Sequence, residues 1–196
     1  MKLNENQLKE LDEKGYLIIP DCFSIEEVNN LCKAMTKVFK EKTEANIVEK
    51  SSGVVRTAMG LHLRSKIFDD LTRHPKFFEP TCQIRGHNLY IQQTKINVKA
   101  AFTGEVWQWH YDFATHSGED GVPKPLALNL HVFLDDVTEF NGPLFFIPKS
   151  HKYGSAPSKL DTITTNYPLW VVDKQTVKTF VKENGIVSAR EKQVQL

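Results

Sequence analysis

The residues with the clearest capacity for chemistry are His110 and Asp112, within the run Trp107–Asp112. Side chains alternate along an extended chain, so an imidazole and a carboxylate two residues apart point to the same side and can reach one ion. With a second histidine from elsewhere, such a pair is the facial triad that binds non-haem Fe(II). A lone His-x-Asp also occurs by chance as an ordinary surface or core pair, so the neighbouring elements must decide.

A predicted strand over residues 88–99 precedes this pair and has two different faces. Ile96 and Val98 lie on one face. The opposite face carries Gln93, Lys95 and Asn97. If the apolar pair packs against helices, the polar residues line an interior; otherwise they form the solvated face of an antiparallel strand. This strand alone leaves both interpretations open.

A second predicted strand, 126–134, follows the pair and favours the interior. Alternate positions from Leu126 to Leu134 are apolar, whereas Asn129 and His131 lie on the other face. Two strands with one polar face each, on either side of the His-x-Asp pair, are typical of a barrel with a polar pocket and helices outside. The same environment favours the metal-ligand interpretation of the pair.

The sequence predicts a single domain, with a mostly helical front over residues 1–87 and a β body over 88–196. The predicted helices are 4–14, one that begins after Ser24, 65–73, 77–85 and 173–183. The further predicted strands are 16–19, 54–57 and 144–147, and residues 152–169 are expected to be a loop, potentially a lid. The helix after Ser24 has a capping-box sequence, because Glu27 follows the serine by three residues.

Composition excludes several classes of function. Of 196 residues, 40% are hydrophobic and 25% charged, and the formal net charge is +1, as in ordinary globular proteins. Lysines alternate with acids, so we expect neither nucleic acid nor a membrane as partner. The N-terminus has no apolar leader, and no segment has the length of a membrane span. Cys22, Cys32 and Cys82 are far apart, which predicts reduced thiols in the cytoplasm rather than a disulfide framework or a zinc site.

The chain resembles the phytanoyl-CoA dioxygenase family, most closely its ectoine hydroxylase branch and the related free amino-acid hydroxylases. The matching motifs, in chain order, are Gln93-x-Lys95-x-Asn97, Phe102-Thr103-Gly104, Trp109-His110-Tyr111-Asp112, Asp120-Gly121-x-Pro123, Asn141-Gly142-Pro143-Leu144 and Ile147-Pro148-Lys149-Ser150-His151-Lys152. The likeness covers most of the chain and is densest between residues 88 and 152.

The resemblance implies a double-stranded β-helix, a cupin-like jelly roll with helices packed on one sheet. It implies Fe(II), 2-oxoglutarate and O2, with decarboxylation of 2-oxoglutarate to succinate coupled to hydroxylation of a small substrate. His110 and Asp112 correspond to the first two iron ligands and so to the catalytic centre. Asn97, Trp107 and Asn129 correspond to cosubstrate contacts, and Gln93, Lys95, His116 and His131 to substrate contacts. A lysine in the pocket suits a substrate carboxylate.

Two further residues bear on the assignment. Halogenating relatives carry a small residue at the position of Asp112, so this aspartate favours hydroxylation. The motif around His151 is a structural turn in the family, so His151 is not expected to be the third ligand. In the family, the distal histidine and the cation that pairs with the 2-oxoglutarate C5 carboxylate follow a helix and glycine like those near residue 185. No histidine follows His151 here and Arg190 comes too early, so we expect a truncated form of a longer enzyme.

Other functions stay open at this point. A non-catalytic, cupin-like protein that binds a small ligand, or an inactive form, would explain the missing third ligand. A hydroxylase of a larger substrate, such as an acyl-CoA, would need a wider pocket and a basic patch for the nucleotide. The sequence shows no such patch. The particular amino acid, the hydroxylated carbon and the oligomeric state are not predicted.

Overall fold

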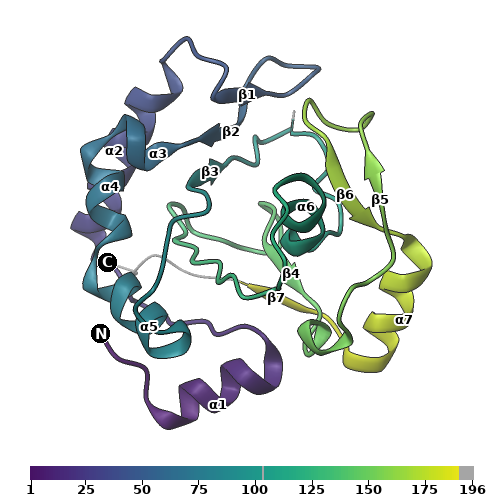
Figure 1. The fold of residues 1–196 in the computed structure, drawn as a ribbon. Coiled ribbons are helices and arrows are strands. Elements are labelled where there is room, and N and C mark those ends of the chain that lie inside the picture. The colour runs from purple at the N-terminus through teal and green to yellow at the C-terminus, as the bar shows by residue number, and fades with distance from the viewer. Residues whose placement is uncertain (103, 190–196) are drawn as a thin grey trace.

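The computed structural model describes residues 1–102 and 104–189. In Figure 1 the helices of the first 87 residues group along the left and lower sides, away from the sheets on the right. Their bounds are α1 Glu5–Lys14, α2 Ile25–Phe39, α3 Leu61–Arg64, α4 Lys66–Thr72 and α5 Pro75–Arg85.

Helix ends are set by local chemistry that the sequence predicts. Asn4 and Ser24 each accept a hydrogen bond from the backbone three residues on, and the Gln7 and Glu27 side chains bond back to the backbone of these caps. These reciprocal bonds satisfy donors that the first helical turn leaves unpaired. Gly15 ends α1 in the left-handed region with φ 84°, which glycine adopts without the steric penalty of a Cβ. The capping box at Ser24 is confirmed.

The strands form three small antiparallel sheets among the described residues. The first has the order β1-β2-β3 and pairs Thr57 with Asn97, and the other two join β4 to β7 and β5 to β6. The strand bounds are β1 Asn46–Val48, β2 Val55–Met59, β3 Lys95–Asn97, β4 Leu144–Phe146, β5 Ser158–Asp161, β6 Leu169–Val172 and β7 Val187–Ala189. Two further helices, α6 Asp112–Glu119 and α7 Lys174–Asn184, and a 3₁₀ turn, η1 Ser150–Tyr153, lie in the part of the molecule that contains β4 to β7. In Figure 1, α6 is at the centre of this part and α7 at its edge.

The core lies between the helical layer and the first sheet. Its buried members are Leu31, Val38, Ala58, Leu61 and Phe68. Ile96 of β3 packs against this cluster, as do Val132 and Leu134 from the later extended segment. Ile96 therefore faces the helices, and its neighbours Lys95 and Asn97 face away from them, as strand alternation requires. Lys95 and Asn97 are exposed on that opposite side of the strand.

Of the two predicted strands that flank the His-x-Asp pair, one is much shorter in the structure and the other forms no backbone ladder within the described part of the chain. Only Lys95–Asn97 of the predicted strand 88–99 joins a ladder, and residues 126–134 join none among the described residues. Period-two patterning reports the environments of the side chains, whereas a strand also needs a neighbour to accept its backbone bonds. Only the end of the predicted apolar face is kept in 126–134, since Val132 and Leu134 pack against the core while Leu126 and Leu130 of the same face are 59% and 46% exposed.

Three further predictions also need correction. Residues 16–19 form no strand; Tyr16 instead stacks on Phe146 of β4 with ring centroids 5.1 Å apart. The predicted loop 152–169 contains β5, which pairs with β6. The β body predicted over 88–196 contains, besides the predicted helix 173–183, helix α6, whose short apolar pattern is too weak to show helical periodicity.

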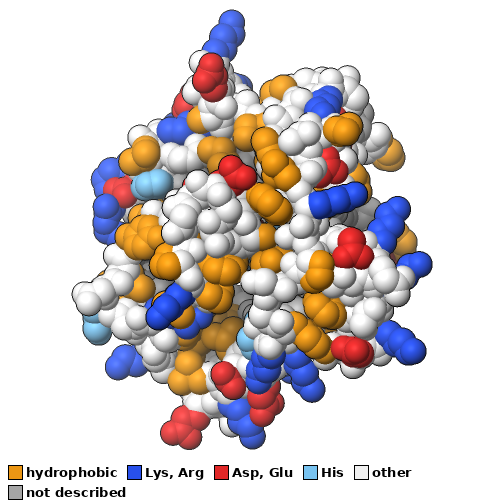
Figure 2. All heavy atoms as spheres, turned by 45° about the vertical axis from the view of Figure 1, so that its right-hand side comes forward, with side chains coloured by type: hydrophobic (Ala, Val, Ile, Leu, Met, Phe, Trp, Pro, Cys, Tyr) orange, Lys and Arg blue, Asp and Glu red, His pale blue; other side chains and the backbone are white. Residues whose placement is uncertain are grey.

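Among residues 1–102 and 104–189, no helix is long and apolar enough to cross a membrane. On the face in Figure 2, basic and acidic side chains are interspersed around hydrophobic ones that gather near its centre. This face therefore carries no broad region of a single charge.

Candidate metal and cosubstrate site

His110 and Asp112 meet at the start of α6. Tyr111 between them is extended, with φ −131° and ψ 135°, so both neighbouring side chains project to one side. His110 Nε2 lies 3.5 Å from Asp112 Oδ1, and both side chains are about 30% exposed, at 29% and 30%. The pair is therefore shielded yet open to a ligand.

The imidazole of His110 is oriented for coordination by its second nitrogen. His110 Nδ1 donates a hydrogen bond to the carbonyl oxygen of Gln108 at 2.7 Å. In the neutral ring, Nδ1 therefore carries the proton and the lone pair lies on Nε2. Nε2 is the ring atom that faces Asp112. A carbonyl that fixes the tautomer of a ligating histidine is the usual second-shell arrangement in metal sites.

The Asp112 carboxylate is held in its charged form. When His110 is protonated, its Nε2–H can donate to Asp112, and this bond lowers the pKa of Asp112 well below its usual range, against the opposing effect of burial. The Lys95 charge and a hydrogen bond from Asn129 Nδ2 act in the same direction. Burial alone would lower the pKa of His110, but its bonds with Asp112 and Gln108 raise it. Asp112 is thus an anionic ligand over the whole physiological range of pH.

The donors present fit the first two ligands of a non-haem iron site. One imidazole nitrogen and one carboxylate oxygen converge, each with a partner behind it that fixes its orientation. Within the part of the chain that the structure describes, no three His, Cys, Asp or Glu residues group as a metal site. Arg190 lies outside the described residues.

The three residues proposed as cosubstrate contacts have different surroundings. Asn129 bonds to Asp112, so it lies against the metal-ligand pair. Asn97 on β3 is exposed and its Oδ1 accepts from Thr57 Oγ1 at 3.2 Å. Trp107 stacks under the guanidinium of Arg56, with the Arg56 Cζ 3.9 Å from the ring centroid. Its indole Nε1 is buried and has no hydrogen-bond partner among the described residues.

Two of the residues proposed as substrate contacts are linked electrostatically to the pair. The positive charge of Lys95 lowers the pKa of Asp112 and opposes protonation of His110 and His131. The pKa of His131 is lowered, mainly by burial, and the negative charge of Asp112 acts in the opposite direction. A cation and a neutral imidazole thus lie beside the ligand pair. Gln93 is exposed on the approach to β3.

His116 lies one helical turn after Asp112 on α6 and has a carboxylate partner that the sequence interpretation missed. His116 Nδ1 donates to Asp120 Oδ2 at 2.7 Å, and Gln92 Nε2 donates to the same oxygen at 3.1 Å. The spacing of four residues between His116 and Asp120 would have shown the pair if α6 had been recognised as a helix.

His151 takes no part in this site. Its Nε2 donates to the carbonyl oxygen of Asp12 at 3.0 Å, and the backbone of Lys149 donates to the carbonyl of Lys14 at 2.8 Å. The turn at η1 therefore binds the carboxyl end of α1, where unpaired carbonyls need donors. This agrees with the structural role expected for His151.

Known proteins resemble this chain in sequence. Ectoine dioxygenase of Bordetella bronchiseptica is 34% identical over 154 residues, which are 76% of this chain and 50% of that protein. L-proline trans-4-hydroxylase of Streptomyces griseoviridis is 36% identical over 140 residues, which are 71% of this chain and 52% of that protein. The chain thus spans about half the length of these curated relatives.

The fold is shared with solved structures. EctD from S. alaskensis with 2-oxoglutarate and 5-hydroxyectoine superposes with a TM-score of 0.83 at 28% identity, over 97% of this chain and 64% of that chain. The same protein with bound Fe gives a TM-score of 0.83 at 27% identity, over 97% of this chain and 65% of that one. The Phytanoyl-CoA dioxygenase (PhyH) profile matches residues 11–186, and the chain belongs to this family.

Proposed function

We propose that the protein is an Fe(II)- and 2-oxoglutarate-dependent dioxygenase that hydroxylates a free amino acid or a similarly small zwitterion. The observation that carries this proposal is the convergence of His110 Nε2 and Asp112 Oδ1, each oriented by a second partner. Relatives named ectoine dioxygenase and L-proline trans-4-hydroxylase support the substrate class.

In this proposal His110 and Asp112 hold the iron, which supplies oxidative chemistry with O2 when 2-oxoglutarate is bound. Asn129 keeps the Asp112 carboxylate turned toward His110, and Lys95 attracts the carboxylate of an amino-acid substrate. Trp107 and Asn97 would contact 2-oxoglutarate, with the indole N–H of Trp107, which has no partner within the described part of the chain, as a donor. Gln93, His116 and His131 would complete the contacts to the substrate.

The proposal includes the finer features of the fold. The architecture would be the double-stranded β-helix, with helices on one sheet, in a single oxygenase domain whose front is 1–87 and whose β body is 88–196. A small molecule would be the partner, with neither nucleic acid nor membrane involved. A cytoplasmic location, expected from the widely spaced cysteines, is also part of the proposal.

The test is turnover of 2-oxoglutarate by the purified protein with Fe(II), ascorbate and O2, against a panel of free amino acids and ectoine. Succinate should form together with a product heavier by one oxygen atom, and Asp112→Ala should abolish both. An absence of succinate with every member of the panel contradicts the proposal. A product from acyl-CoA but none from a free amino acid would replace the small zwitterion by a larger substrate.

A second function, non-catalytic binding of a small ligand in the same pocket, is favoured by one observation. The described residues bring together two metal ligands rather than three. Metal analysis of the purified protein separates the two functions. A binding protein without redox chemistry should contain no stoichiometric iron, either as isolated or after iron is added.

A further inference from the structure

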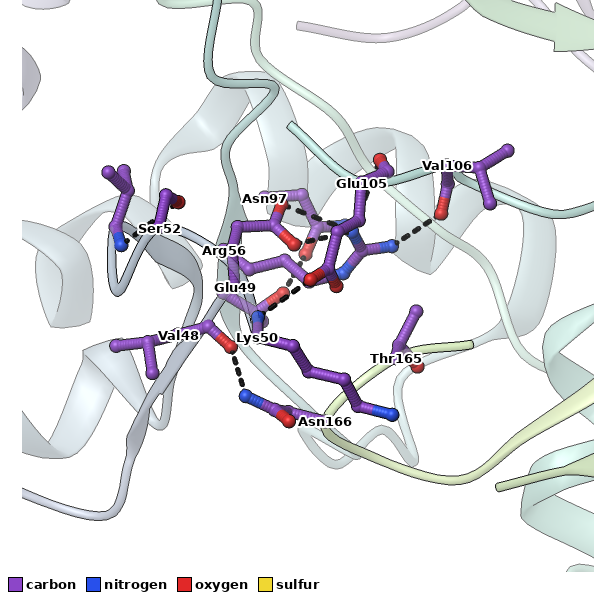
Figure 3. A network of polar contacts seen from close by, with 12 residues as sticks. Val48, Glu49, Lys50, Ser52, Arg56, Asn97, Glu105, Val106, Thr165 and Asn166 are labelled. Carbon is purple, nitrogen blue, oxygen red and sulfur yellow. Dashed lines mark hydrogen bonds and ion pairs between the residues drawn. The ribbon is translucent and has the colours of Figure 1, made fainter. Parts of the chain in front are cut away.

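Arg56 of β2 is an unusual residue for the interior, because it is a fully buried cation. Its exposed fraction is 0%, and that of its partner Glu49 is 1%. Arg56 Nη1 donates to both carboxylate oxygens of Glu49 at 3.2 Å (Figure 3). Transfer of two charges out of water is costly, and well-packed apolar residues often replace such pairs without loss of stability. The contacts that Arg56 makes beyond Glu49 are therefore informative.

Beyond Glu49, the hydrogen bonds of the Arg56 side chain and its closest ring contact fall on one short segment, Glu105–Trp107, while the Tyr167 ring centroid lies farther off, 5.9 Å from Cζ. Arg56 Nη1 donates to the carbonyl of Glu105 at 3.3 Å, and Nη2 donates to the carbonyl of Val106 at 3.0 Å. The planar guanidinium then lies over the Trp107 ring, with Cζ 3.9 Å from its centroid. Three successive residues are thus fixed by one side chain, which uses both its fork of donors and its flat face.

The same segment is held from two further directions. The Glu105 carboxylate accepts from the backbone N–H of Lys50 at 2.7 Å (Figure 3). It also accepts from the backbone N–H of Ser51 at 3.3 Å. On the other side, Gln108 Nε2 donates to Asp161 Oδ2 at 3.0 Å, next to the end of β5. Residues 105–108 are therefore bound between the β1–β2 loop and the β5–β6 connection, two parts of the chain far apart in sequence.

This held segment leads directly into the candidate iron site. Gln108 is its last residue, and its carbonyl is the acceptor that fixes His110 Nδ1 at 2.7 Å. The indole Nε1 of Trp107 is buried without a partner among the described residues. A buried donor without a partner is costly, so it is expected where a bound ligand completes the hydrogen bond. Any movement of 105–108 would displace both groups together.

We propose that Arg56, neutralised by Glu49, is a positioning residue that holds segment 105–108 so that Trp107 faces bound cosubstrate and His110 faces the metal. The inference rests on the proposed function for what the site binds. The mechanical part, that Arg56 orders residues 105–108, is independent of it. Arg56 touches neither metal nor substrate in this arrangement and acts only through the segment.

The test replaces the buried pair by apolar residues, in the double variant Glu49→Leu/Arg56→Met. Two properties are measured on the metal-free protein and on titration with Mn(II) alone: amide hydrogen exchange of residues 106–110, and the Mn(II) dissociation constant. We expect faster exchange in this segment and at least a tenfold weaker Mn(II) affinity, the range found when the outer partners of metal ligands are lost. Unchanged exchange with an Mn(II) constant within twofold overturns the proposal.

Arg64 offers a matched control, since it is a largely buried arginine with structural contacts elsewhere. Its side chain is 13% exposed, pairs with Glu41 at 2.9 Å, and donates to the carbonyls of Met59 and Val38. Arg64→Met should lower the thermal midpoint while both readouts at 105–110 stay as in the unmodified protein. Equal changes in both readouts for the control would show a general loss of packing and overturn the specific role of Arg56.

Two outcomes need separate treatment. If the double variant does not fold, Arg56→Lys serves instead, because lysine keeps the charge but loses the second donor and the flat stacking face; the same expectations apply. If the unmodified protein binds no Mn(II), the proposed function fails, and amide exchange alone decides the positioning role. Faster exchange in the Arg56 variant than in Arg64→Met then supports it, and equal exchange overturns it.

Discussion

Asn129 donates a hydrogen bond from its side-chain amide to Oδ2 of Asp112, across a sequence separation of 17 residues. His110 contacts the other carboxylate oxygen. The carboxylate is thus fixed on both sides, and its rotation about the last side-chain bond is restricted. A bound metal would find this ligand already in place.

Removal of this amide should weaken metal binding without unfolding the protein. We expect Asn129→Leu to raise the Mn(II) dissociation constant by about tenfold to a hundredfold, the usual effect of a lost second-shell partner. Isothermal titration with Mn(II) measures this. Asn184→Leu on α7 is the control, since that amide also donates two bonds, to Tyr153 Oη at 2.7 Å and Phe180 O at 3.1 Å, far along the chain from the site. An equal loss of affinity in both variants would contradict a specific role for Asn129.

Lys95 should affect the binding of anions and the binding of cations in opposite directions. Its charge stabilises ionised Asp112 and opposes protonation of His110 and His131, so it lies close enough to repel a metal cation and attract a carboxylate. Lys95→Met is expected to leave Mn(II) affinity unchanged or slightly tighter, while KM for an amino-acid substrate rises at least tenfold. A weaker Mn(II) affinity in Lys95→Met would show that the lysine supports the metal site instead.

Gly15 is expected to be intolerant of any side chain. Its φ of 84° is strained for other residues, and a Cβ there would overlap the imidazole of His151. Gly15→Ala should therefore destabilise the protein by about 2–4 kcal/mol, the sum of backbone strain and overpacking. Gly53→Ala is the control for strain alone, because Gly53 has φ 69° with open space around its Cβ position. Urea unfolding of the two variants should differ, and Gly15→Ala/His151→Ala should recover part of the loss.

The ion pair between Glu27 and Lys76 predicts a dependence of stability on pH. The hydrogen bond from Lys76, together with that from the Ser24 backbone, lowers the pKa of Glu27 from 4.5 to about 2. A carboxyl whose pKa is lowered on folding stabilises the protein above its unfolded pKa, and this contribution disappears as pH falls from about 4.5 toward 2. Because Glu27 is 33% exposed, solvent screening keeps the effect below about 1 kcal/mol.

Urea midpoints of the unmodified protein and of Glu27→Gln, measured between pH 6 and pH 3, check this prediction. The unmodified protein should be the more stable at pH 6, and the difference should shrink through the acid range. A constant difference at every pH would mean that the ionised carboxylate contributes nothing, and that the two side chains differ only in their packing.

The structure shows which sequence patterns carry reliable physical information. Helix ends could be predicted because caps such as Ser24 with Glu27 satisfy backbone donors locally, within a few residues. The convergence of His110 and Asp112 could be predicted because side-chain alternation is also local. The fold family could be recognised because its motifs are collinear over residues 11–186.

What could not be predicted depends on partners distant in the chain. Residues 126–134 alternate like a strand, but the absence of a backbone ladder among the described residues cannot be read from alternation. Arg56 lies 49 residues before Glu105, to whose carbonyl it donates, and a single arginine in a strand gives no sign of this contact. The pairing of Asp120 with His116 could not be predicted because it depends on the helix α6, which the sequence pattern does not indicate.

The segment 126–134 also has a consequence for how this chain can vary. Asn129 reaches Asp112 from one face, while Val132 and Leu134 pack into the core from the other. Because Val132 and Leu134 are fixed in the core, their packing determines how far the Asn129 amide extends toward Asp112. A single residue inserted or deleted between positions 129 and 132 would exchange the two faces. Insertions and deletions between positions 129 and 132 should therefore not be tolerated. The exposed polar connection at residues 40–44 should tolerate insertions and deletions of its own.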